Sequence, residues 1–183
     1  AYIWEGGTRL VVDEPSSMSS HGAWYNGFNG TEDGYALAGW VTSASATTPL
    51  KHPWSSNSAG LELYAIWKAN AYTVKFNANG GSGGQAKDIT ATYGSAMPAI
   101  STTKPTRAGY AFQGWYDTSA STGGTQYYTA DGKSARKWDK TSNTTLYARW
   151  TANTYNVRYF TKDGTHIGTD QKAYDAWFNL RGD

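Results

Sequence analysis

The chain has no cysteine, few charged residues and no long apolar run, and each shortage excludes a class of function. Without cysteine there is no disulfide, no thiolate zinc ligand and no thiol nucleophile. The 16 Lys and Arg residues nearly balance the 14 Asp and Glu residues and form no basic cluster, so nucleic acid is not an expected partner. Because no stretch of 18 apolar residues occurs, we expect no insertion into a membrane.

Aromatic residues and glycine are abundant instead. The 183 residues include 9 Trp, 14 Tyr, 5 Phe and 21 Gly. The aromatic side chains supply enough apolar surface for a folded core, which excludes a charge-rich disordered chain.

The sequence repeats itself. The segment GYALAGW at 34–40 recurs as GYAFQGW at 109–115, and LYAIW at 63–67 recurs as LYARW at 146–150. The segment AYTVKF at 71–76 is similar to TYNVRY at 154–159. These matches predict a divergent first copy, a complete second copy and the start of a third, truncated copy: residues 1–69, 70–151 and 152–183.

Each copy is larger than a solenoid unit and long enough to be a small domain. We therefore expect modules arranged end to end. Small-angle scattering should then give a radius of gyration above about 19 Å, whereas a single compact domain of this length would give about 16 Å.

Apolar residues within the copies alternate with polar ones, as in half-buried β-strands. Tyr72, Val74 and Phe76 share one face of such a strand, and similar strands are predicted near 89–93 and 146–150. The repeated tryptophans should lie in the cores. They are Trp40, Trp67, Trp115 and Trp150.

The segments between these strands are predicted with less regular structure. Glycine favours a hairpin turn at 79–84, and the insertion at 122–133 is expected to be a longer loop. A short helix is predicted at 131–140 with Asp131 as its cap. In the third copy, strands are expected at 155–159 and 173–178.

The second copy resembles a known family. YTVKFNANGG at 72–81, PTRAGYAFQGWY at 105–116, KWD at 137–139 and TLYARW at 145–150 follow the pattern of the Listeria–Bacteroides repeat, also called the internalin B-repeat. The first copy keeps GYxxxGW and LYAxW but not the NxNGG turn or the PTRxGY segment. The third copy has only the opening strands.

The resemblance implies a mainly β fold of tandem, small β-grasp-like (ubiquitin-like) modules. It also implies a secreted or wall-attached bacterial protein that acts as a stalk or adhesive spacer. It implies no catalytic residue and no cofactor.

The residues that could carry chemistry agree with that implication. His21, His52 and His166 are not spaced as metal ligands, so no metal site is expected. The acidic pairs Asp13-Glu14 and Glu32-Asp33 are interpreted as solvated loop charges, because adjacent strand residues point to opposite faces. No nucleophile or phosphate-binding motif is present.

Two groups of residues are candidates for ligand binding. Trp54, Tyr127 and Tyr128 lie outside the clear strand alternation, and exposed rings of this kind can stack on glycans. Spare aromatic residues also pack under loops in small domains, which is the alternative. Arg181, Gly182 and Asp183 form the tripeptide that integrins recognise in other proteins, although chance occurrence within a truncated repeat also accounts for it.

Two functions follow. The first is a non-catalytic extracellular stalk or adhesin segment at a bacterial cell surface or cell wall. Its partners would be a host or neighbouring-cell surface protein or glycan, or another copy through the truncated repeat. The alternative is a carbohydrate-binding accessory region of a larger secreted enzyme. Catalysis by the chain itself is not expected.

Overall fold

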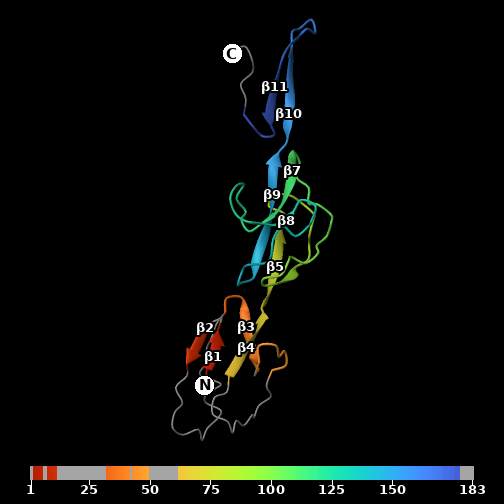
Figure 1. Cartoon of the computed structure of the whole chain (residues 1–183). Coiled ribbons are helices and arrows are strands. Elements are labelled where there is room, and N and C mark those ends of the chain that lie inside the picture. The colour runs from red at the N-terminus through yellow and green to blue at the C-terminus, as the bar shows by residue number, and fades with distance from the viewer. Residues whose placement is uncertain (1, 6–7, 12–31, 42, 50–61, 178–183) are drawn as a thin grey trace. The chain divides into compact units, whose positions relative to one another are not determined.

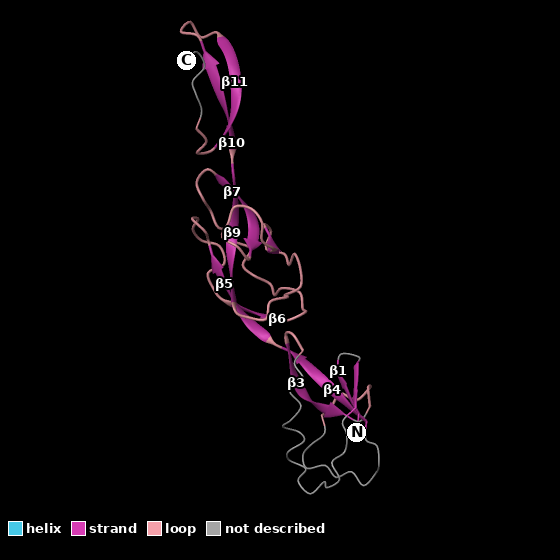
Figure 2. Ribbon diagram, turned by 90° about the vertical axis from the view of Figure 1, so that its left-hand side faces the viewer, coloured by secondary structure: helices cyan, strands magenta, loops and turns pink. Residues whose placement is uncertain are grey.

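The computed structural model describes residues 2–5, 8–11, 32–41, 43–49 and 62–177. They belong to two compact units, residues 1–71 and 72–183. The described residues form strands, turns and loops with no helix, as the ribbon in Figure 2 shows, so the mainly β prediction is confirmed.

The first unit contains one mixed sheet of four strands in the order β2-β1-β4-β3. These are β1 (Tyr2–Glu5), β2 (Thr8–Val11), β3 (Tyr35–Val41) and β4 (Glu62–Ala69). The first strand, β1, runs parallel to the last strand, β4, while the β1–β2 and β3–β4 pairs are antiparallel.

The second unit repeats this order and adds a strand. Its five-stranded sheet has the order β6-β5-β9-β7-β8. Figure 1 labels four of these strands, and Figure 2 labels β6. The strands are β5 (Ala71–Asn77), β6 (Ile89–Thr92), β7 (Tyr110–Tyr116), β8 (Gln126–Thr129) and β9 (Thr144–Ala152). Again the first strand, β5, runs parallel to the last, β9, and β7 pairs antiparallel with both β8 and β9.

The repeated GYxxxGW motif has the same structure in both units. It forms the strand that pairs with the last strand, and a bulge lies between Leu37 and Gly39 in one unit and between Phe112 and Gly114 in the other. Gly114 has a φ of 127°, and a Cβ there would collide with the carbonyl oxygen of Tyr128. The bulge therefore requires glycine, and it places the following Trp115 in the core.

The core of the second unit lies under the predicted strand faces. Val74, Ala91, Leu146 and Ala148 are fully buried, which confirms the period-two interpretation. Trp115 and Trp150 are buried, as predicted, and Trp138, which the alternation did not single out, is buried as well. The centroid of the Phe76 ring lies 5.0 Å from that of Trp115. The centroid of the Phe112 ring lies 5.4 Å from that of Trp115 and 5.6 Å from that of Trp150. In the first unit Trp40 is buried and Trp67 is half-buried.

The glycine turn is confirmed, but the loop and helix predictions are wrong. Within the predicted span 79–84 the chain turns at Asn79 and Gly80, which have φ of 50° and 83°. The insertion at 122–133 contains strand β8, because its aromatic residues pair with β7 and fill the core. Residues 131–140 form no helix, because their backbone groups bond to other segments: Ala135 N–H donates to Tyr127 O over 2.9 Å, and Trp138 N–H to Ser95 O over 2.8 Å.

Beyond β9 the chain forms a two-stranded antiparallel sheet of β10 (Thr154–Phe160) and β11 (His166–Ala173). The first of these is the strand predicted at 155–159. The prediction of a strand at 173–178 is wrong, because the chain turns after Ala173, where Asp175 has a φ of 60°.

Candidate functional site

Both candidate glycan-binding tyrosines are fully buried, so the prediction that they are exposed is wrong. Neighbouring residues of β8 face opposite sides of the strand, and each side is covered. The Tyr128 ring lies 6.0 Å from Phe76, and its hydroxyl donates to Pro98 O over 2.8 Å. The Tyr127 ring lies 5.1 Å from Trp138 on the segment that follows β8. Neither ring presents a face to a sugar.

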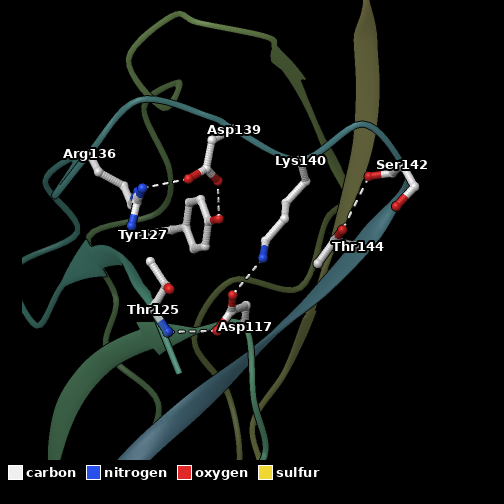
Figure 3. Close-up of polar contacts among 8 residues, drawn as sticks. All are labelled: Asp117, Thr125, Tyr127, Arg136, Asp139, Lys140, Ser142 and Thr144. Atoms are coloured by element: carbon white, nitrogen blue, oxygen red, sulfur yellow. Dashed lines mark hydrogen bonds and ion pairs between the residues drawn. The ribbon is translucent and has the colours of Figure 1, made fainter. Parts of the chain in front are cut away.

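A polar network surrounds the hydroxyl of Tyr127 (Figure 3). Asp139 accepts hydrogen bonds from Tyr127 and from Arg136. Burial of the Tyr127 phenol, together with the adjacent Asp139 carboxylate, raises the pKa of Tyr127. The phenol therefore stays protonated and acts as a donor, which ties the segment after β8 to the strand.

A second carboxylate, that of Asp117, lies in the same region and holds two neighbouring segments. Lys140 Nζ lies 2.9 Å from Asp117 Oδ2, and Thr125 N–H donates to Asp117 Oδ1 over 2.6 Å (Figure 3). Burial opposes ionisation of Asp117, but the hydrogen bonds from Lys140 and Thr125 outweigh it and lower the pKa of the carboxyl group. These contacts hold loops in place around β7 and β8.

Several candidates named from the sequence lie outside the described residues. These are Trp54, Arg181, Gly182, Asp183, His21, His52, Asp13 and Glu14. His166 is described at the start of β11, where its Nε2 lies 2.9 Å from Thr169 Oγ1. In the described part of the chain, no three His, Cys, Asp or Glu side chains gather as metal ligands.

The end of β9 and the β10–β11 sheet meet in a cluster that the sequence did not single out. We call Arg107, Gly109, Tyr110, Asn153, Tyr174 and Asp175 the boundary cluster. Tyr174 N–H donates to Asn153 O over 2.8 Å, and Asn153 N–H donates to Gly109 O over 2.8 Å. The Tyr174 ring lies over Gly109, where any Cβ would overlap it. The first glycine of GYxxxGW, Gly109, thus accepts a backbone hydrogen bond from Asn153, and its missing side chain leaves room for the Tyr174 ring.

Tyr110 completes this cluster. Its ring stands edge-on to Tyr174 with centroids 5.5 Å apart, and its hydroxyl donates to Asp175 Oδ2 over 3.3 Å. The guanidinium of Arg107 lies 3.9 Å from the ring centroid on the same tyrosine, a cation–π contact. Aromatic and hydrogen-bonded contacts therefore join the third copy to the second, and Arg107 packs on the tyrosine that makes them.

One bond of the boundary cluster recurs in the first unit. Asn70 N–H donates to Gly34 O over 2.8 Å, as Asn153 does to Gly109. A signal for the cluster was present in the sequence: Tyr174-Asp175 follows the third copy's opening strands as Tyr93-Gly94 follows those of the second. Both Gly94 and Asp175 have positive φ, at 71° and 60°.

Comparisons with known proteins agree with this repeated architecture. The model of the Listeria–Bacteroides repeat domain matches residues 2–66 and 72–149. The chain belongs to this family. The two matched segments cover most of the two sheets described above, including both bulged strands.

Longer proteins carry similar sequence. Two are from Evansella cellulosilytica: a "Putative Gly-rich membrane protein", 30% identical over 79% of this chain, and a "Putative membrane protein", 32% identical over 82%. Internalin H of Listeria monocytogenes is 35% identical over 67% of the chain. The chain spans only 16–21% of the length of these relatives. No solved structure matches the chain significantly. None of the described residues forms a helix long and apolar enough to cross a membrane.

Proposed function

We propose that this chain is a non-catalytic spacer segment of a bacterial cell-surface protein. The observation that carries the proposal is the way one repeat follows another. A single residue, Asn70, separates β4 from β5, and a single residue, Asn153, separates β9 from β10. The backbone N–H of each asparagine bonds to the glycine of GYxxxGW in the preceding repeat. A chain in which one repeat begins directly after the last strand of the one before suits a tandem spacer.

The relatives support a location outside the cell. Two are named as membrane proteins and one as an internalin. We place the segment at the cell surface or in the cell wall, where it holds another part of the same protein away from the envelope. Protein–protein adhesion by the segment itself, to a host or neighbouring-cell surface, is part of this proposal.

The carbohydrate-binding alternative is less well supported. Two of its three aromatic candidates, Tyr127 and Tyr128, are core residues. The third, Trp54, lies outside the described residues. We therefore favour the spacer.

We also propose that each module is β-grasp-like. The support is a mixed sheet whose first and last strands are parallel neighbours, with an antiparallel partner on either side. In the second unit an irregular segment, residues 93–109, connects β6 to β7 and packs Met97 and Ile100 against the core. This segment takes the place of the helix that a β-grasp domain carries in that connection.

The location is testable on intact cells. Gly83 is exposed and has no atom near the position of a Cβ, so an epitope tag inserted there should be tolerated. An antibody should label the tagged parent protein without permeabilisation, while a tagged cytoplasmic protein stays unlabelled. Labelling only after permeabilisation would overturn the proposal. Binding of the purified chain to a glycan array would favour the carbohydrate alternative instead.

A further inference from the structure

The first and last strands of each repeat lie side by side and point the same way. In the second unit β5 pairs parallel with β9, and the register runs from Val74 opposite Thr144 to Asn77 opposite Tyr147. In the first unit β1 pairs parallel with β4, from Tyr2 opposite Glu62 to Trp4 opposite Tyr64. The chain therefore enters and leaves each sheet on neighbouring strands.

Side-chain bonds extend the β5–β9 contact beyond its backbone ladder in both directions. At the start of the pair, Thr73 N–H donates to Asn143 Oδ1 over 2.8 Å. At the far end, Asn79 Nδ2 donates to Ala148 O and Trp150 Nε1 donates to Ala78 O, each over 3.0 Å. The bonded contact between these two segments thus reaches from Asn143 to Trp150.

This geometry decides how the repeat meets a pulling force. Tension along a tandem chain acts at the start of β5 and at the end of β9, which are opposite ends of a parallel pair. It therefore tries to slide one strand along the other. The hydrogen bonds between the strands lie across that direction and are loaded together, whereas strands pulled apart at one end lose their bonds one after another.

The neighbouring contacts direct the load into this pair. Because only Asn70 precedes β5 and only Asn153 follows β9, little slack chain lies outside the sheet. The end of β9 is also paired antiparallel with β7, where Ala152 lies opposite Tyr110. A pull on β9 is thereby shared with the strand that carries Trp115.

We propose that each repeat is a load-bearing module whose mechanical clamp is the parallel pair of its first and last strands. The inference rests on the proposed function, because a surface tether is the setting in which such a clamp bears force. The clamp resists extension until β5 and β9 slip, and the repeat then unfolds in one step and lengthens the tether.

The absence of cysteine makes a direct test simple, because two engineered cysteines are unique attachment points. In the full chain, the double variant Ala71→Cys/Thr151→Cys pulls β5 and β9 in shear. The double variant Ala71→Cys/Ser142→Cys pulls the same strands apart from one end, since Ser142 lies just before β9. All three positions are exposed, and matching melting temperatures of the two variants would show that the substitutions leave the module intact.

Single-molecule force spectroscopy at one pulling speed compares the two directions, because forced unfolding reports the barrier along the pulled coordinate. We expect the shear variant to unfold at a force several times that of the peeling variant. Equal forces would overturn the clamp and leave the cell-surface location standing. A chain found inside the cell would overturn the location without changing the force measurement.

A third variant tests the side-chain extension of the clamp. Asn79→Gly keeps the positive φ of 50° at this turn and removes the side-chain bonds to Ala148 O on β9 and to Ser119 O on the loop after β7. It should lower the shear force while leaving the peeling force unchanged, because peeling starts at the Thr73 end. Thr90→Ala, on the exposed side of β6, is the control and should change neither force. An unchanged shear force in Asn79→Gly would show that the side-chain bonds are not part of the clamp.

Discussion

Replacing Gly114 by alanine should destabilise the second repeat more than replacing Gly83, a glycine of the 79–84 segment with open space around it. Gly114 lies at the β7 bulge with a φ of 127°, which side chains rarely adopt. A Cβ at this position would overlap the carbonyl oxygen of Tyr128 and lie 2.5 Å from Nε2 of Gln126. The Tyr128 carbonyl belongs to the backbone of the paired strand β8, so it cannot move away without disturbing the sheet, whereas the Gln126 side chain can rotate.

The expected loss has two parts. Positive φ costs a non-glycine residue about 1–3 kcal/mol, and overpacking a tight site costs about 1–3 kcal/mol more. The sum is about 2–6 kcal/mol. A module of about 80 residues has a total stability of roughly 4–12 kcal/mol. Gly114→Ala therefore removes a large share of the free energy of unfolding, and it unfolds the module outright if the stability of that module is near the lower end of this range.

Gly83→Ala is the matched control in the same module. Gly83 also has a positive φ, 73°, but no atom lies within 4 Å of its Cβ position. It should lose only the backbone part, about 1–3 kcal/mol. Urea unfolding followed by tryptophan fluorescence measures both variants, with an unchanged dependence on urea showing that the same surface unfolds. Equal losses in the two variants would refute the steric argument and leave only the backbone term.

Three further predictions concern the core, the acid response and the boundary cluster. Trp115→Ala should cost about 3–5 kcal/mol in urea unfolding, whereas Trp177→Ala, which removes a fully exposed side chain, should cost nothing measurable; equal melting of both would place Trp115 outside the core. The pKa of Asp117 is lowered from 3.8 in the folded state, so the ionised carboxylate stabilises the fold above pH 3.8, and this stabilisation is lost as the pH falls through the folded-state pKa. In acid titrations Asp117→Asn should therefore lose less stability below pH 3.8 than the wild type does. Parallel stability curves for the two proteins would contradict this. Tyr174→Ala should speed hydrogen exchange of the residue 174 amide, which donates to Asn153 O, without changing the melting of the second repeat; unchanged exchange would show that the ring does not hold the boundary.

The sequence by itself determined several strands of the second unit and their inner faces. Tyr72, Val74 and Phe76 alternate with polar residues, and a period of two has only one structural meaning when one face is buried. The recurrence of Gly-Trp at 39–40 and 114–115 revealed the repeat and its core tryptophans. The structure supplies the reason for the glycine, because the bulge there leaves no room for a side chain.

Tertiary structure alone decided what covers the second face of each segment. Tyr127 and Tyr128 are adjacent, so local pattern required one of them to point outward; both are buried because residues 131–140 fold over the outer side of β8. Residues 131–140 do not form the predicted helix, because their backbone groups bond to other segments of the chain. The parallel pairing of β5 with β9 joins residues some 70 positions apart, and the contact of Tyr174 with Gly109 joins two repeats. Such contacts depend on which surfaces the folded chain brings together, and the periodicity of a single strand carries no information about its distant neighbours.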